Sequence, residues 1–216
     1  SESNTWTYDG EEHTEETYTV TYGGEEIEPE DDGVTFKLPT GDKIVVTPTA
    51  SVKDVADTDT ENNTFTYTLE NDDQYDDVTT VYGDLAVTPA PIVITVPDNS
   101  KEYGTDDPTF EDGELPDDLS DNFKTELKDI DTKAYRTNDD EEVGEYDEVL
   151  TTKKTAKDYE EEYPNFTFTV VPGNFEITSP KAIVITSGSN TWTYDGEEHT
   201  EETYTVTYGG EEIKPE

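Results

Sequence analysis

The two histidines are the residues best suited to acid–base or nucleophilic chemistry, yet neither lies in a supporting motif. His13 and His199 occupy equivalent, glutamate-rich segments. A catalytic triad requires a histidine that is held by a second group and faces an activated serine or cysteine. The chain has no cysteine and no Gly-x-Ser-x-Gly motif. We therefore expect solvated loop histidines, no catalytic residues and no enzyme activity.

Metal binding is the stronger chemical candidate because acids are abundant. Asp59, Glu61, Asn63 and Glu70 have the spacing of positions 1, 3, 5 and 12 of a calcium loop, but Thr64 stands where that loop needs glycine. Two aspartate clusters, at 72–77 and 117–121, favour turns and a solvated surface, with weak calcium binding as the alternative. A pair of carboxylates for glycoside cleavage is expected by chance among 56 acids. We predict no built metal site and no cofactor.

The aromatic residues could form a sugar-stacking platform, but their spacing favours a core. Trp6, Tyr8, Tyr18 and Tyr22 alternate with threonines, as the inward-facing residues of half-buried strands do. A lysine–asparagine isopeptide bond would need a buried lysine beside a carboxyl group. Lys37 and Lys43 adjoin strand residues and are expected to point outward.

The elements that must position these residues are mainly strands. Alternation with threonine, bounded by turn residues such as Gly23-Gly24, predicts strands throughout the chain. The predicted strands are Thr5–Tyr8, Thr17–Tyr22, Val34–Leu38, Ile44–Thr47, Thr64–Glu70, Leu85–Thr88, Ile92–Val96, Thr109–Glu111, Glu145–Thr151, Asn165–Val170 and Asn174–Thr178. Leu115, Leu119, Phe123 and Leu127 recur every four residues, which predicts one short helix. The expected fold is mainly β, with tandem small β-grasp-like or Ig-like sheets and one helix in the second module.

A long internal repeat organises the chain. Residues 3–30 recur as residues 189–216, with Glu28 against Lys214 as the only difference. Residues 83–89 and 173–180 also resemble each other in pattern, and they end at Pro89 and Pro180. Each is closely followed by an Ile-Val-Ile-Thr strand. We therefore predict module A at residues 1–89, module B at 90–180, and the start of another module A at 181–216, here called the C-terminal segment. The prolines suit short, stiff joints.

This division makes the ends of the sequence unequal. Module A, starting at Ser1, lacks the Ile-Val-Ile-Thr strand that precedes Ser187. The C-terminal segment is about a third of a module, too little to bury a core alone. It could dock on module B or pair with the open edge of another molecule, unless the true boundary lies elsewhere.

The large negative charge of the chain argues against nucleic acid and anionic membranes as partners. The 56 acids against 13 bases give a net charge of −43. Such a surface repels nucleic acid and anionic membranes, and it keeps neighbouring copies apart. The sequence also contains no apolar run long enough to span a bilayer. We expect no nucleic-acid binding and no membrane insertion in this segment.

Several motifs resemble repeats of bacterial cell-surface adhesins. Tyr8-Asp9-Gly10 is similar to the YDG repeats, and Lys101–Phe110 resembles the start of the MBG repeats of the YGX type. The endings at Pro89 and Pro180 match the usual end of these modules. The strong acidity and the long insert near 129–142 depart from the family pattern.

The resemblance implies a secreted, wall-anchored protein on the bacterial surface. Its repeats would form an extended stalk in which each module contacts its neighbours in the same chain. The alternative is that each module binds a host glycan or protein weakly and gains strength from multivalency. No family-wide catalytic residues exist to be carried over.

Overall fold

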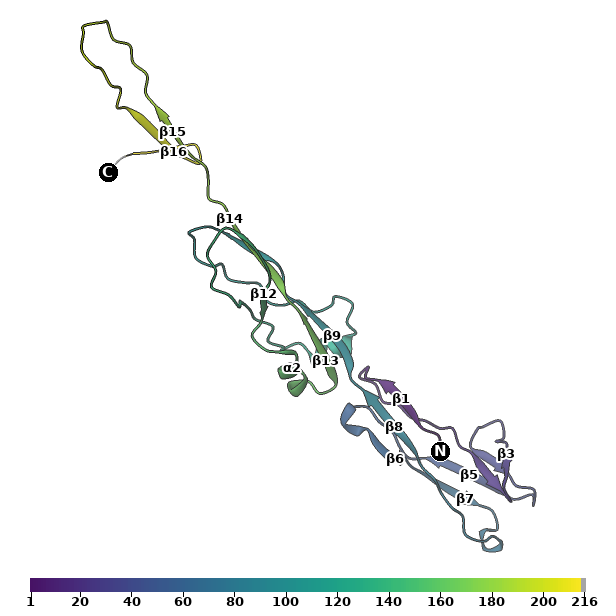
Figure 1. Ribbon diagram of the computed structural model, residues 1–216. Helices are drawn as coiled ribbons and strands as arrows, with labels where there is room; N and C mark the ends of the chain where they lie inside the picture. The colour runs from purple at the N-terminus through teal and green to yellow at the C-terminus, as the bar shows by residue number, and fades with distance from the viewer. Residues whose placement is uncertain (215–216) are drawn as a thin grey trace.

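The computed structural model describes residues 1–214 and has the shape of a rod (Figure 1). The N-terminal residues lie in one end of the rod and strand β15 lies near the other. The mainly β architecture of small sheets in series is confirmed. The boundaries at residues 89 and 180 stay predictions, and the module names are kept for those residue ranges.

Module A contains three small sheets. A mixed sheet has the order β1-β8-β6, an antiparallel sheet the order β4-β5-β7, and β2 pairs with β3 as a hairpin. The bounds are β1 Asn4–Thr7, β2 Val20–Tyr22, β3 Glu25–Ile27, β4 Thr35–Lys37, β5 Lys43–Pro48, β6 Asp59–Asn63, β7 Phe65–Leu69 and β8 Gly83–Thr88, with short 3-10 turns η1 at Val55–Asp57 and η2 at Asp72–Gln74.

Module B contains two sheets and two helices. The larger sheet has the order β10-β14-β12-β11, and β9 pairs with β13 in parallel. The bounds are β9 Ala90–Thr95, β10 Asn99–Glu102, α1 Asp121–Glu126, β11 Ala134–Arg136, β12 Gly144–Thr152, α2 Ala156–Glu162, β13 Phe166–Val171 and β14 Gly173–Thr178.

Two sequence predictions in module B are corrected. Residues Thr109–Glu111 form no strand, because Phe110 lies in a loop and places its ring edge-on against Phe175. Module B also has two short helices instead of one. The unpredicted helix α2 begins at a capping box in which Thr155 and Asp158 satisfy each other's backbone N–H groups.

The C-terminal segment forms an antiparallel sheet of β15 Ile183–Ser187, β16 Tyr204–Tyr208 and β17 Glu211–Ile213. None of its described residues is buried. One side chain reaches module B, where the Tyr208 hydroxyl donates to Glu102 at 3.2 Å. The segment therefore has strand pairing without a core, as its length led us to expect.

One apolar core runs through the boundary between modules A and B. Strands β8 and β9 are separated only by Pro89, and both turn alternate side chains inward. Module A contributes buried Tyr8, Val52, Leu85 and Val87, and module B contributes Ala90, Ile92, Ile94, Leu127, Tyr159, Phe166 and Phe168. We call these residues the shared core. Two smaller clusters lie farther out, one in each module.

Candidate functional site

The histidines pack against aromatic rings. His13 Nε2 lies 3.0 Å from Asp9 Oδ1, and its ring stacks on Trp6 with centroids 5.1 Å apart. His199 repeats the arrangement with Asp195 and Trp192. In residues 1–214 neither ring bonds to a hydroxyl group, so the geometry offers no activated nucleophile.

The residues with calcium-loop spacing do not converge. The Asn63 side chain is buried and donates to the carbonyl oxygens of Glu2 and Glu15. The Glu70 carboxylate accepts instead from the Lys43 backbone N–H at 3.0 Å. Across residues 1–214 no group of three or more His, Asp or Glu side chains is placed to hold a metal ion.

The aromatic residues divide between core and surface. Tyr8 and Tyr18 are buried, and Trp6 is half-buried against the shared core, as expected. Tyr22 is 39% exposed and lies edge-on to Tyr75. The four residues therefore do not form one flat platform.

The Tyr8-Asp9-Gly10 motif lies at the joint between modules A and B, where it contacts helix α1 and the shared core. The Tyr8 ring stacks on Phe123 at 5.8 Å and meets Phe166 edge-on at 5.3 Å. Its hydroxyl donates to Glu126 at 2.6 Å. Burial, and secondarily Glu126, raise the pKa of Tyr8, so the ring stays neutral and keeps its donor proton at physiological pH.

The rest of the motif fits closely against helix α1. Asn122 donates to the Asp9 carbonyl oxygen at 3.2 Å and to the Glu11 carboxylate at 2.7 Å. Gly10 has φ of +83°, and a Cβ there would lie 2.9 Å from the Cβ of Asn122. Glycine is therefore needed both for the turn and for the close approach.

A third polar contact flanks the shared core. Asn165 accepts from the Val55 backbone N–H at 3.0 Å and donates to the Asp54 carboxylate at 2.8 Å. The joint thus combines a nearly continuous strand, a shared apolar core and three polar side-chain contacts, made by Tyr8, Asn122 and Asn165. Relative rotation of the modules would break all three kinds of contact.

The next joint, after β14, has no such packing within the described residues. Tyr103 follows β10 as Tyr8 follows β1, and both N–H groups donate to the last residue of the parallel neighbour, Thr178 or Thr88. Tyr103 is nevertheless 52% exposed, whereas Tyr8 is 5% exposed. The difference shows how much of the first joint depends on the module that follows.

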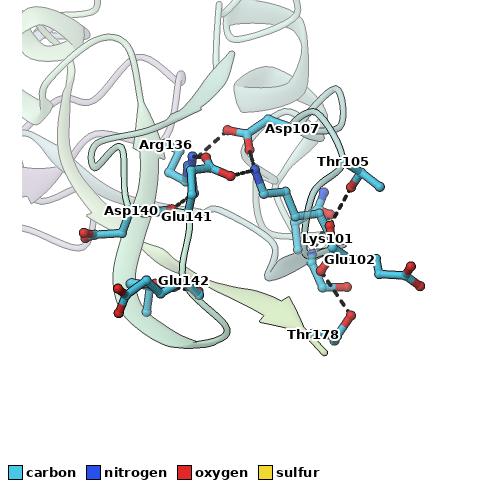
Figure 2. A network of polar contacts seen from close by, with 12 residues as sticks. Lys101, Glu102, Thr105, Asp107, Arg136, Asp140, Glu141, Glu142 and Thr178 are labelled. Atoms are coloured by element: carbon cyan, nitrogen blue, oxygen red, sulfur yellow. Dashed lines mark hydrogen bonds and ion pairs between the residues drawn. The ribbon is translucent and has the colours of Figure 1, made fainter. Parts of the chain in front are cut away.

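An ion-pair network with buried cationic side chains links loops of module B (Figure 2). Lys101 contacts Asp107 at 2.8 Å and also Glu141, and Arg136 contacts the same two carboxylates. The Lys101 and Arg136 side chains are only 4% and 6% exposed. Hydrogen bonds to Asp107 and Glu141 raise the pKa of Lys101, so its amine stays a cation and is no nucleophile.

Sequence reasoning considered other lysines for isopeptide chemistry. Lys37 is exposed, and Lys43 pairs with Glu30 at 2.7 Å on the surface, so both point outward as expected. Lys101 was missed because its partners lie 6 and 40 residues away. An isolated lysine between polar residues carries no sequence signal of burial.

We expect Glu141→Gln to destabilise the chain most near neutral pH. Hydrogen bonds from Lys101, then Arg136, lower the pKa of Glu141 below its usual value. A carboxyl group with a lowered folded-state pKa stabilises the fold above its unfolded pKa, and that contribution is lost as pH falls through the folded pKa. The difference in Tm between wild type and variant should therefore shrink to nothing in acid.

The matched control is Glu142→Gln, which removes one negative charge from the adjacent residue. The side chain of Glu142 is exposed, and only its carbonyl oxygen is used, by Tyr146. Thermal melts of the three proteins between neutral pH and pH values below the usual carboxyl range test the expectation. The expectation would be contradicted by equal Tm changes for the two variants. It would also be contradicted by a Tm difference between wild type and Glu141→Gln that does not change with pH.

Comparison with known proteins adds no relative. No family model, curated protein or solved structure matches this chain. Within residues 1–214, no helix has the length and apolar character required to cross a bilayer.

Proposed function

We propose that this chain is a non-catalytic spacer segment in the stalk of a secreted, wall-anchored bacterial adhesin. The observation that carries the proposal is the shared core, which makes modules A and B one continuous body. A chain of such bodies would hold a distal part of the protein at a distance, since the joint between modules A and B resists bending. The rod shape in Figure 1 supports the same function.

Sequence features give further support. Near-identity between residues 3–30 and 189–216 includes exposed acids, which indicates copying of whole units. Copy number then sets stalk length, while the net charge of −43 keeps neighbouring stalks apart. The resemblance to YDG and MBG repeats supports the surface location.

The expected result is that contour length grows linearly with copy number. The test proteins contain one, two or three consecutive copies of residues 1–186, and residues 187–216 follow once, after the last copy. This preserves the natural register, because residues 189–216 repeat residues 3–30 at an offset of 186. Small-angle scattering and electron microscopy measure the length. Each added copy should contribute the same increment, because each copy brings one stiff A–B body of the same length.

A flexible-joint control isolates the role of the A–B joint. Inserting a Gly/Ser linker after Pro89 in every copy separates β8 from β9 and divides the shared core. The end-to-end distance of that protein should grow closer to the square root of the copy number, as flexible chains do. If the unmodified series also departs from linear growth, the stalk proposal fails.

A further inference from the structure

The strands that enter and leave module B run side by side along the rod. The chain arrives from module A in β9 and leaves toward the C-terminal segment in β14 (Figure 1). Residues 96–98 separate β9 from β10, and Pro172 alone separates β13 from β14. We call residues 90–102, which hold β9 and β10, the entering segment, and residues 166–178, which hold β13 and β14, the leaving segment.

Hydrogen bonds join the two segments over their whole length. The ladder between β9 and β13 contains six residue pairs, and the ladder between β10 and β14 contains four. Between the two ladders, the Val96 N–H donates to the Val171 carbonyl oxygen at 2.9 Å. Beyond the second ladder, the Tyr103 N–H donates to the Thr178 carbonyl oxygen at 3.0 Å. The entering and leaving segments are therefore paired from one end of module B to the other.

Both ladders are parallel, which sets them apart from most of the chain. Within residues 1–214, three strand pairs are parallel, β1 with β8, β9 with β13 and β10 with β14, and the other eight are antiparallel. Parallel neighbours need a long crossover connection, whereas a short turn can join antiparallel ones. Each parallel pair joins a strand near the start of a module to one near its end. The chain thus makes this long connection only where an entering strand meets a leaving one.

Module A has the same arrangement in β1 and β8. Their parallel ladder contains four residue pairs and ends with Thr7 opposite Thr88. The Tyr8 N–H extends it by donating to the Thr88 carbonyl oxygen at 2.8 Å. Strand β8 then continues into β9 across Pro89. The leaving strand of module A is therefore joined to the entering strand of module B by a single residue, with no loop between them.

The direction of pairing decides how module B carries a pull along the rod. Tension draws the start of β9 toward module A and the end of β14 toward the C-terminal segment (Figure 1). Because the two segments are parallel, these points lie at opposite ends of the paired region. The segments can then separate only by sliding past each other, which strains all the ladder hydrogen bonds together. In an antiparallel pair the same two points would be adjacent, and the ladder would open one residue pair at a time.

Buried side chains on both segments oppose sliding as well. Ile92 and Ile94 of β9 and Phe166 of β13 are buried in the shared core. Phe175 and Ile177 of β14 are buried in the outer cluster of module B. A slip of one residue would turn the buried face of a strand toward solvent. Sliding therefore costs apolar burial in addition to hydrogen bonds.

We propose that the entering and leaving segments form a shear clamp with which module B bears tension along the chain. Forced unfolding depends on the rate of unfolding, and hence on the height of the unfolding barrier. Shear raises that barrier because the ladder contacts must break in one step. The inference rests on the proposed stalk function for the source of the tension. It adds that the stalk carries a load as well as holding a distance.

Single-molecule force spectroscopy with two pulling directions tests the clamp. The chain has no native cysteine, so a pair of introduced cysteines fixes where the load is applied to the full chain. Handles on Pro91→Cys and Ser179→Cys load the clamp in shear. Handles on Pro91→Cys and Thr167→Cys peel the same ladder from one end, because Pro91 pairs with Thr167. All three residues are exposed, and Pro91 has no N–H group to lose from the ladder.

The length of chain released in each direction identifies the unfolding event. The shear handles enclose 88 residues (179 − 91 = 88), which span at most about 300 Å when extended. The peeling handles enclose 76 residues (167 − 91 = 76), or at most about 260 Å. Module A and the C-terminal segment lie outside both pairs of handles and carry no load. Thermal melts of the two double variants should agree, so that only the direction of pulling differs.

At equal loading rate, the unfolding force should be several-fold higher in shear than in peeling. A second peeling pair, Val93→Cys with Thr169→Cys, uses another two paired and exposed positions of the ladder and should also unfold at low force. Shear forces no higher than the peeling forces overturn the proposal. That result would leave the stalk function standing, because a rod can hold a distance without bearing tension, and contour length against copy number tests it separately.

Discussion

Replacing Phe166 with alanine should lower the free energy of unfolding by about 3–5 kcal/mol, the range for large aromatic residues in cores. Phe166 is 1% exposed, and its ring contacts Tyr8, Phe123 and Phe168. Because Tyr8 belongs to module A and the other two rings to module B, the cavity opens inside the shared core. We expect both modules to lose stability.

The measurement is chemical denaturation combined with amide hydrogen exchange. Exchange should accelerate in β8 of module A as well as in β9 and β13, since these strands enclose the same core. Val171→Ala is the control on the same strand. Because Val171 is 41% exposed, its replacement should lower the free energy of unfolding by about 0.5 kcal/mol or less. Equal costs for the two variants, or unchanged exchange in β8, would show that the core is not shared.

Strands with alternating apolar residues were predictable from the sequence. Phe65–Leu69 and Phe166–Val171 are found almost as predicted, since one face of each meets a core. Strand β6, Asp59–Asn63, was not predicted, because it is acidic and lacks alternation. Its pairing with β8 and the buried Asn63 amide hold it in place, and neither contact leaves a local pattern.

The joint was predictable only in part. Alternation indicated that Tyr8 is a core residue, and the prolines indicated a short connection. The partners of the joint lie far away in the sequence, as with Asn165 and Asp54, which are 111 residues apart. Helix α2 did carry a local signal, the Thr155/Asp158 capping box, which sequence reasoning overlooked. Tertiary contacts of single polar residues remain the part that sequence patterns do not encode.

Replacing Tyr8 with alanine should turn the stiff joint into a hinge. The change removes the ring between Phe123 and Phe166 and the hydrogen bond to Glu126. Truncating a buried aromatic residue costs about 3–5 kcal/mol, and here much of that loss falls on the contact between the modules. Strands β8 and β9 still connect the two modules through Pro89. Each module should therefore remain folded, while the angle between the modules varies over a wider range.

Spin labels on Lys37→Cys and Val143→Cys, one exposed site in each module, measure that angle as a distance distribution. Wild type should give one narrow distribution and Tyr8→Ala a broad one. Tyr8→Phe keeps the ring and loses only the hydroxyl group that donates to the Glu126 carboxylate. It should therefore cost about 1.5–3 kcal/mol, the range for a hydrogen bond to a charged group, and broaden the distribution little. Tyr103→Ala alters the equivalent but exposed position of module B and should change nothing. A narrow distribution for Tyr8→Ala would mean that strand continuity alone keeps the rod straight.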